Sequence, residues 1–282
     1  MTRNCSVSRR SPQSLLVATT STGAGWAQDF LLIADVHFDN PHCKRGLLRQ
    51  HLDMAQERGA GILIVGDWFD AMQSRDDPRR SKASLSPDFL VDYIDSVIDD
   101  SVAFLRPYAE NIVMVSEGNH ESAIRKKVET NLTRRLAKEL GVEAMRYSGW
   151  VQFRIMEGGR SRRLVNLYFT HGSGGGGPVT KGVIQHNRRA AMLNDAQIVV
   201  SGHIHEYWTV VNTVHGINGA GKPYFFDQLH ISLPTYKEEF EEMEGYHTEK
   251  GRPPKPLGGV WLRFNARHSA PGRISYEALR AE

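Results

Sequence analysis

Short apolar runs alternate with amphipathic segments along the chain from about residue 30 onward. Five runs are rich in β-branched residues and bounded by glycine or acidic residues, which is typical of strands buried on both faces. These runs are Phe30–Ala34, Ile62–Val65, Ile112–Val115, Val165–Phe169 and Ile198–Val200. The pattern predicts five buried strands.

Between the apolar runs, a helical repeat of apolar positions predicts three helices. The predicted ranges are 47–58, 88–105 and 130–140. Each range ends at a residue that stops helices, namely Gly59, Pro107 and Gly141. Strands that alternate with helices indicate an α/β sheet, in which the loops converge at the carboxyl ends of the strands.

The N-terminal stretch, residues 1–26, differs from the rest because it is rich in Ser, Thr and Arg and lacks periodicity. This composition predicts a flexible tail outside the folded domain. The domain is then expected to span residues 27–282. It would include a C-terminal elaboration with an acidic run over 238–244 and a proline-rich run over 252–256.

Polar clusters follow the five apolar runs directly. Their members carry oxygen or imidazole donors, which hard and borderline divalent metals prefer. They are Asp35 and His37, Asp67 and Asp70, Asn119, His120 and Glu121, His171, and His203 and His205. In an extended chain, alternate side chains point to the same side, so His203 and His205 can face one ion together. The clusters predict a metal-centred hydrolase.

The order and spacing of these clusters resemble the calcineurin-like metallophosphoesterase superfamily. The motifs of that family run D-x-H, G-D-x-x-D, G-N-H-[DE], a lone His and G-H-x-H, and the resemblance covers about Phe30 to Tyr207. It implies a one-domain, four-layer αββα sandwich. The second sheet would take strands from Trp150–Ile155, Tyr207–Val214 and Gly259–Phe264.

The resemblance also implies a centre of two divalent metal ions. Asp67 would bridge both ions, since a carboxylate has two oxygens. The remaining ligands would be Asp35, His37 and His205 for one ion, and Asn119, His171 and His203 for the other. Such mixed ligands fit Mn, which we favour, and also Fe, Zn, Ni or Co.

Catalytic roles follow from the same resemblance. A hydroxide shared by the ions would attack phosphorus, while His120 assists the leaving group. Asp70, three residues after Asp67, would orient His120. We interpret Glu121 as structural, because an acidic residue at the start of a helix is favoured by the helix dipole.

Departures from the protein serine/threonine phosphatases of the family favour a different substrate. Ala71 and Met72 follow Asp70, and Glu117 precedes Gly118, so the phosphate-clamping arginines of that branch are missing. The aromatic Trp68 after Asp67 resembles the branch of DNA-repair nucleases, small phosphodiesterases and lipid-nucleotide pyrophosphohydrolases. We therefore expect a phosphodiester substrate, which includes DNA, RNA or a nucleotide.

Basic residues outside the motifs leave two interpretations open. One basic group follows the second motif and consists of Arg75, Arg79, Arg80 and Lys82, and another is the Arg125–Lys127 run. These groups form either a basic surface that binds nucleic acid or an ordinary solvated surface. The glycine-rich segment 173–178 is expected to be a mobile loop at the mouth of the site. The residues after it either contact substrate phosphate or form a solvated helix face; they are Lys181, His186, Arg188 and Arg189.

Two other functions remain as alternatives. One is a phosphomonoesterase or protein phosphatase, in which Arg188 or Arg189 replaces the missing arginines in space. The other is a non-catalytic scaffold that binds a phosphate or a protein through the same fold. The complete set of ligands and His120 argue against the scaffold, because a scaffold does not need them.

Composition adds little to the functional assignment. The formal net charge of +3 over 282 residues neither requires nor excludes a polyanionic partner. With only Cys5 and Cys43 no disulfide framework is implied, and we expect a cytoplasmic location. No apolar run approaches the roughly 18 to 20 residues that span a bilayer. The sequence leaves the oligomeric state open, a homo-oligomer included.

Overall fold

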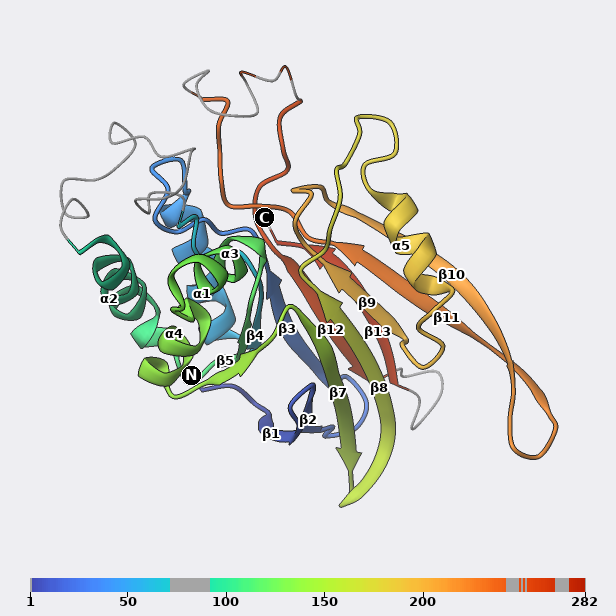
Figure 1. Ribbon diagram of the computed structural model, residues 1–282. Coiled ribbons are helices and arrows are strands. Elements are labelled where there is room, and N and C mark those ends of the chain that lie inside the picture. The colour runs from blue at the N-terminus through green and yellow to red at the C-terminus, as the bar shows by residue number, and fades with distance from the viewer. Residues whose placement is uncertain are drawn as a thin grey trace.

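Two β-sheets pack face to face and carry helices on both outer faces (Figure 1). The computed structural model describes residues 2–71, 92–241, 249, 251, 253–266 and 274–281. Helices α1 to α4 cover one sheet, and α5 is the one described helix on the other side of the sandwich (Figure 1). The expected one-domain αββα arrangement is confirmed.

The six-stranded sheet has the strand order β13-β12-β3-β4-β5-β6. Its strands are β3 (Ala27–Ile33), β4 (Gly61–Val65), β5 (Ile112–Ser116), β6 (Glu143–Met145), β12 (Val260–Ala266) and β13 (Ile274–Arg280). Strands β3 to β6 run parallel, so their carboxyl ends share one edge. Strand β12 lies antiparallel beside β3, with Leu262 opposite Phe30.

The seven-stranded sheet has the order β1-β2-β7-β8-β9-β11-β10. Its strands are β1 (Ser6–Ser11), β2 (Ser14–Thr20), β7 (Ser148–Glu157), β8 (Arg160–Thr170), β9 (Ile198–Ser201), β10 (Trp208–Ile217) and β11 (Pro223–Ser232). The expectation of a flexible tail over residues 1–26 is wrong, because β2 pairs with β7 and buries Leu15 and Val17 completely. The serine- and threonine-rich composition concealed a strand whose central residues, Leu15 to Val17, are all buried.

The five predicted strands are all present, but they are divided between the two sheets. The first three are β3, β4 and β5, whereas the last two are β8 and β9 of the seven-stranded sheet. Of the three segments expected in the second sheet, β7 and β10 lie there and β12 does not. A buried apolar run shows that a strand forms and not which sheet it joins.

Five α-helices and a short 3-10 helix over Arg106–Tyr108 complete the described part of the chain. The α-helices are α1 (Arg45–Glu57), α2 (Tyr93–Leu105), α3 (Asn119–Val128), α4 (Leu132–Leu140) and α5 (Val183–Ala190). The predicted helices correspond to α1, α2 and α4, although the expected start near residue 88 lies outside the described residues. Within the described chain, no helix is both long and apolar enough to cross a membrane.

Aromatic side chains hold the two sheets together between their inner faces. Phe30 of β3 lies with its ring centroid 4.7 Å from that of Phe153 on β7. Phe153 in turn lies 5.0 Å from Phe264 on β12. All three are buried, and tilted ring pairs of this kind add about 0.5–1.5 kcal/mol each beyond area burial. This packing fixes the position of one sheet relative to the other.

Buried polar contacts dock α5 on the outer face of the seven-stranded sheet. His186 of α5 lies with Nε2 2.5 Å from Ser201 Oγ and Nδ1 3.2 Å from His230 Nδ1. His230 Nε2 lies 2.7 Å from Gln228 Oε1. Burial, and then the charge of Arg189, lowers the pKa of His186 to about 3 and that of His230 to about 4. Both imidazoles are therefore neutral at neutral pH.

These contacts predict that acid destabilises the fold. Because the folded pKa of His186 lies below its ordinary value of 6.5, the unfolded chain binds more protons between those values, and stability rises with pH there. Acidification from about pH 7 to about pH 5 should cost on the order of 2 kcal/mol through this group. We expect His186→Phe to reduce the drop in melting temperature over that range.

The matched control is His215→Gln, which replaces an exposed histidine of β10. It should leave the drop in melting temperature unchanged. An equal drop in His186→Phe and the unmodified protein, measured by circular dichroism at both pH values, would show that His186 does not titrate on unfolding.

Candidate metal centre

The polar clusters lie at the edge where the carboxyl ends of strands from both sheets meet. Strands β3, β4 and β5 of the six-stranded sheet lead into the first three clusters. Strands β8 and β9 of the seven-stranded sheet lead into His171 and into the pair His203 and His205. The face-to-face packing therefore brings together residues that no single sheet could supply.

One group of candidate ligands consists of Asp35, His37 and His205, whose donor atoms lie within 4.8 Å of one another. His205 Nε2 lies 3.2 Å from Asp35 Oδ1 and 3.3 Å from His37 Nε2. Asp35 and His37 are buried. Two imidazole nitrogens that face each other beside a carboxylate oxygen are suited to share a cation.

A second group consists of Asp67, His171 and His203. Asp67 Oδ2 lies 3.0 Å from His171 Nε2. Asn119, in the first turn of α3, lies with Oδ1 3.0 Å from His171 Nε2 and 2.7 Å from His203 Nδ1. All of the second set of predicted ligands thus converge.

The two groups adjoin each other, since His171 Nε2 also lies 3.8 Å from Asp35 Oδ1. The structure brings all seven predicted ligands into one cluster; they are Asp35, His37, Asp67, Asn119, His171, His203 and His205. Which atoms bind which ion, and the bridging role of Asp67, stay predictions.

The backbone at these residues adopts conformations that side chains rarely allow. Five of the seven have positive φ angles; they are Asp35 (51°), His37 (49°), Asp67 (47°), His203 (74°) and His205 (55°). Left-handed backbone at a residue other than glycine costs of order 1–3 kcal/mol and is concentrated at functional sites. The fold thus aims these side chains inward against local preference.

Glycines in three motifs permit close approach between the strand ends. A Cβ added at Gly118 would lie 2.0 Å from Asp67 Oδ1, and one at Gly202 would lie 2.4 Å from Asp35 Oδ2. At Gly66, whose φ is +76°, it would lie 2.5 Å from His171 Nδ1. Each glycine is required because a side chain would displace a candidate ligand.

The charges of the cluster fit cations. Among the described residues, the ion-pair partners of Asp35 and Asp67 are histidines, with no lysine or arginine. Although burial opposes charge, the Asp67 and Asp35 carboxylates raise the pKa of His171 to about 10. Asp35 Oδ1 is buried without a partner in good hydrogen-bond geometry. Buried negative charge of this kind needs compensation, which divalent cations provide.

Asp70 supports His37 from outside the cluster. Its Oδ1 lies 2.8 Å from His37 Nδ1, and its Oδ2 accepts a hydrogen bond of 3.0 Å from Asn40 Nδ2. Lys237 Nζ lies 3.8 Å from the same Oδ1. A carboxylate on the far nitrogen of a ligating histidine fixes the orientation and tautomer of the ring.

Asp70 contacts His120 by a different atom from the one expected. His120 Nδ1 bonds to the backbone carbonyl of Asp70, because His37 and Asn40 occupy its carboxylate. The predicted contact between the Asp70 carboxylate and His120 is therefore wrong. The carbonyl is held in place by Asp39, which accepts hydrogen bonds from the backbone N–H groups of Asp70 (2.6 Å) and Ala71 (3.0 Å).

Three supporting residues were missed at the level of sequence. Asp39 and Asn40 follow His37 closely, and their proximity to the first motif was a usable signal. The sequence contained no such signal for Lys237, because this residue lies far along the chain from Asp70. It is held beside the site by a β-bridge to Cys43 and by an ion pair of 3.0 Å with Glu239.

The structural interpretation of Glu121 agrees with its contacts. Its carboxylate accepts hydrogen bonds from the backbone N–H groups of Gly118 (2.8 Å), Phe69 (3.0 Å) and Asp67 (3.2 Å). Burial and the charge of Asp67 raise its pKa to about 7. Glu121 thus ties the second motif to the third through backbone hydrogen bonds.

The basic residues outside the motifs have different positions. His186 is buried between α5 and the seven-stranded sheet, so the suggestion that it contacts substrate is wrong. Lys181 lies 3.8 Å from Glu206, and Arg125 lies 3.3 Å from Glu117. The run containing Arg75, Arg79, Arg80 and Lys82 lies outside the described residues. The mobility expected of segment 173–178 stays a prediction.

Two adjoining groups of buried carboxylate, amide and imidazole donors define a candidate two-metal centre of the kind found in hydrolases. Residues 29–207, which include every motif, match the family described as calcineurin-like phosphoesterase. The chain belongs to the calcineurin-like phosphoesterase family, whose members depend on two metal ions.

Several solved structures are similar to the chain. A predicted phosphoesterase from Streptococcus pneumoniae TIGR4 is 12% identical, with 91% of each chain covered and a TM-score of 0.34. Vps29 complexed with Zn²⁺ from Entamoeba histolytica is 10% identical, with 90% and 99% covered and a TM-score of 0.36. GAP50, the anchor in the inner membrane complex of Plasmodium, is 10% identical, with 91% and 89% covered and a TM-score of 0.39. No curated protein matches the chain.

The metal centre is testable at Asp67. Asp67→Asn keeps the shape of the side chain but removes its charge, so we expect the affinity for Mn²⁺ to fall at least about tenfold. The rise in melting temperature on adding Mn²⁺ should shrink accordingly, because a ligand stabilises only in proportion to its binding. Elemental analysis of metal per chain and thermal melts measure both effects.

Asp195→Asn is the matched control, since this exposed aspartate lies outside the site. It should bind Mn²⁺ as the unmodified protein does. Two ions per chain retained at full affinity in Asp67→Asn would contradict the assignment of a bridging ligand.

Proposed function

We propose that the protein hydrolyses phosphodiesters, in nucleic acid, nucleotides or related compounds, with two divalent cations and His120 as the proton donor to the leaving group. The position of His120 carries this proposal. Its Nε2 lies 3.7 Å from Asp67 Oδ2, and its Nδ1 is fixed by the Asp70 carbonyl. A non-catalytic scaffold needs no imidazole oriented toward the candidate bridging carboxylate.

The surroundings of His120 favour its protonated form. Burial lowers its pKa, but the charges of Asp67 and then Asp70 outweigh burial and raise it. Bound cations would offset the effect of the Asp67 charge on the pKa of His120, whereas the effect of the Asp70 charge would remain. A carbonyl oxygen only accepts, so His120 Nδ1 donates to the Asp70 carbonyl, and in the protonated imidazolium Nε2 carries the second proton, which it can give to the leaving group. The cations would supply Lewis acidity and an activated water.

The donor set supports manganese without requiring it. Four imidazoles, two carboxylates and one amide oxygen make up the seven proposed ligands. Carboxylate and amide oxygens suit Mn²⁺, while imidazole also suits Fe, Zn, Ni and Co. We therefore propose Mn²⁺ as the working cofactor and expect other borderline cations to compete with it.

The charges around Glu117 support a diester over a monoester. Glu117 stands where protein phosphatases of the family have an arginine, and it is buried. It lies 3.1 Å from Arg146 and 3.3 Å from Arg125, so part of the nearby positive charge is already neutralised. A phosphomonoester carries more negative charge than a diester and would gain more from free arginines.

A cytoplasmic location remains our proposal because of the cysteines. Cys5 and Cys43 are both free thiols in the structure. Burial raises the pKa of Cys5 to about 11 and that of Cys43 to about 12, so both stay as unreactive thiols. Such cysteines suit a reducing compartment.

The proposal is tested with bis-p-nitrophenyl phosphate and Mn²⁺. We expect His120→Ala to lower turnover by at least about 100-fold, the usual effect of removing a general acid. Its metal content should stay the same, because the predicted ligand is Asn119 and not His120. His215→Ala, at an exposed position of β10, is the matched control and should retain full activity.

Equal turnover in His120→Ala and the unmodified protein would remove His120 from the reaction. Faster hydrolysis of p-nitrophenyl phosphate than of the diester would identify a monoesterase instead. No hydrolysis of either compound by a protein that binds two ions would favour the scaffold. Single-stranded DNA, RNA and cyclic nucleotides then separate the diester substrates.

A further inference from the structure

Strand β10 forms one edge of the seven-stranded sheet. It pairs with β11 along its whole length, from Trp208 opposite Ser232 to Ile217 opposite Pro223. On its other side, no strand of the described chain pairs with it. A ten-residue strand therefore presents a row of backbone N–H and C=O groups that a further strand could pair with.

The sequence of β10 lacks the protection that the other edges have. Strand β1 carries Arg9 and Arg10, and β13 carries Glu277 and Arg280. Strand β6 is three residues long and carries Glu143. By contrast, β10 contains no Asp, Glu, Lys, Arg or Pro. Charges, prolines and short length are the features by which proteins prevent edge pairing, and β10 has none of them.

Apolar side chains are exposed on one face of the hairpin that β10 forms with β11. Val211 is 57% exposed and Ile217 69% exposed, and Phe225 of β11 on the same face is 69% exposed. The hairpin extends well beyond the body of the sandwich (Figure 1). The described part of the chain thus leaves this face largely uncovered.

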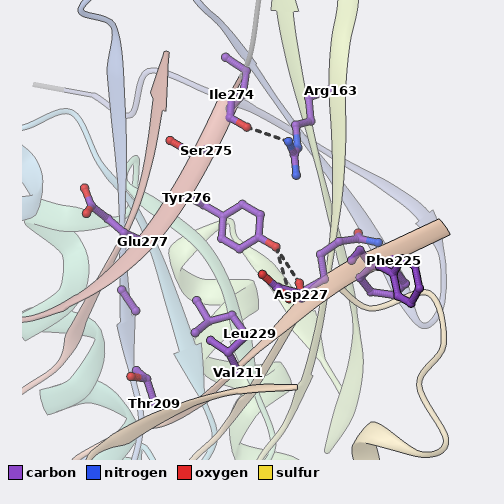
Figure 2. A pocket seen from close by; sticks show the side chains of 13 residues that line it. Arg163, Thr209, Val211, Phe225, Asp227, Leu229, Ile274, Ser275, Tyr276 and Glu277 are labelled. Atoms are coloured by element: carbon purple, nitrogen blue, oxygen red, sulfur yellow. Dashed lines mark hydrogen bonds between the residues drawn. The ribbon is translucent and has the colours of Figure 1, made fainter. Parts of the chain in front are cut away.

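A groove of about 700 Å³ separates this face from strand β13 (Figure 2). Two of the polar side chains that line it are already engaged: Arg163 donates to the Ile274 carbonyl at 2.8 Å, and Tyr276 Oη donates to the Asp227 carbonyl at 3.4 Å. The groove shows that the six-stranded sheet does not cover the hairpin.

We propose that a second copy of this chain pairs with β10, antiparallel and edge to edge, to form a homodimer. A twofold axis normal to the sheet keeps the same face of both hairpins on one side, so their exposed apolar side chains join into one surface. Because β10 is uncharged, the two copies meet without like-charge repulsion.

The pairing rule for antiparallel strands also fixes the register to a few choices. Two residues directly opposite each other in neighbouring strands point to the same face of the sheet. In a symmetric pair of β10 strands the twofold axis therefore lies level with one residue of each copy and not between two successive residues. With the axis at Asn212 or at Thr213, Val211 lies opposite Thr213 or His215 of the second copy. Both arrangements place β-branched or aromatic side chains in cross-strand pairs.

The test is the mass of the purified full-length protein by light scattering after gel filtration, over a range of concentrations. The unmodified protein should have twice the 31.7 kDa mass of one chain. Val211→Lys places a lysine on each strand at the seam, and we expect it to raise the dissociation constant of the dimer at least about tenfold. Val211 is exposed, so this change should not impair folding.

Leu164→Lys is the matched control. Leu164 is 48% exposed on β8, which β9 and β11 separate from β10 in the order of the sheet. It should remain dimeric. Hydrogen exchange should show β10 amides protected in the unmodified protein and exposed in Val211→Lys, while β7 amides are unchanged.

A monomer at about 100 μM, a concentration at which even weak specific pairing is populated, would overturn the proposal. So would a dimer that Val211→Lys leaves intact, or a dimer without protection of β10. These readings do not depend on hydrolysis, so they stand or fall separately from the proposed function.

Discussion

The structure is organised around two carboxylates, Asp35 and Asp67, that are buried without a lysine or arginine as an ion-pair partner in the described chain. Buried charge is costly unless it is compensated, and here the nearest compensating groups are imidazoles. Those imidazoles come from strands of both sheets. The positions of the loops that carry these imidazoles and the expected affinity for cations both follow from this one electrostatic requirement.

The backbone carries part of the cost of meeting that requirement. Left-handed conformations at Asp35, Asp67 and three of the histidines are unfavourable locally. Carboxylates hold two of these residues by their backbone N–H groups, because Asp67 donates to Glu121 and His203 donates to Asp35. Glu121 holds the loops after β4 and β5 together, and Asp39 fixes the Asp70 carbonyl. Acidic residues thus serve two purposes in this site, some facing the centre and others holding the loops that form it.

The sequence predicted the candidate ligands better than it predicted their surroundings. Motifs such as His203-x-His205 have fixed spacing and come directly after apolar runs. Their convergence was predictable because the loops at the carboxyl ends of neighbouring strands lie close together. The contacts of Asp70 and Lys237 depend on segments far apart in the chain, and spacing holds no information about them. The fold class was predictable for the same reason, whereas the strand β2 was not, because the serines and threonines around Leu15 and Val17 give the segment a polar composition although Thr19 is itself buried.

Because the candidate ligands come from both sheets, bound ions would join the two halves of the sandwich. Asp67 follows β4 of one sheet, and His171 follows β8 of the other. Ions shared between them would act as a removable cross-link, comparable to a disulfide between the sheets but dependent on metal concentration. Metal supply would then set the rigidity of the sandwich as well as its chemistry, and the aromatic packing between Phe30 and Phe153 would hold the sheets together in its absence.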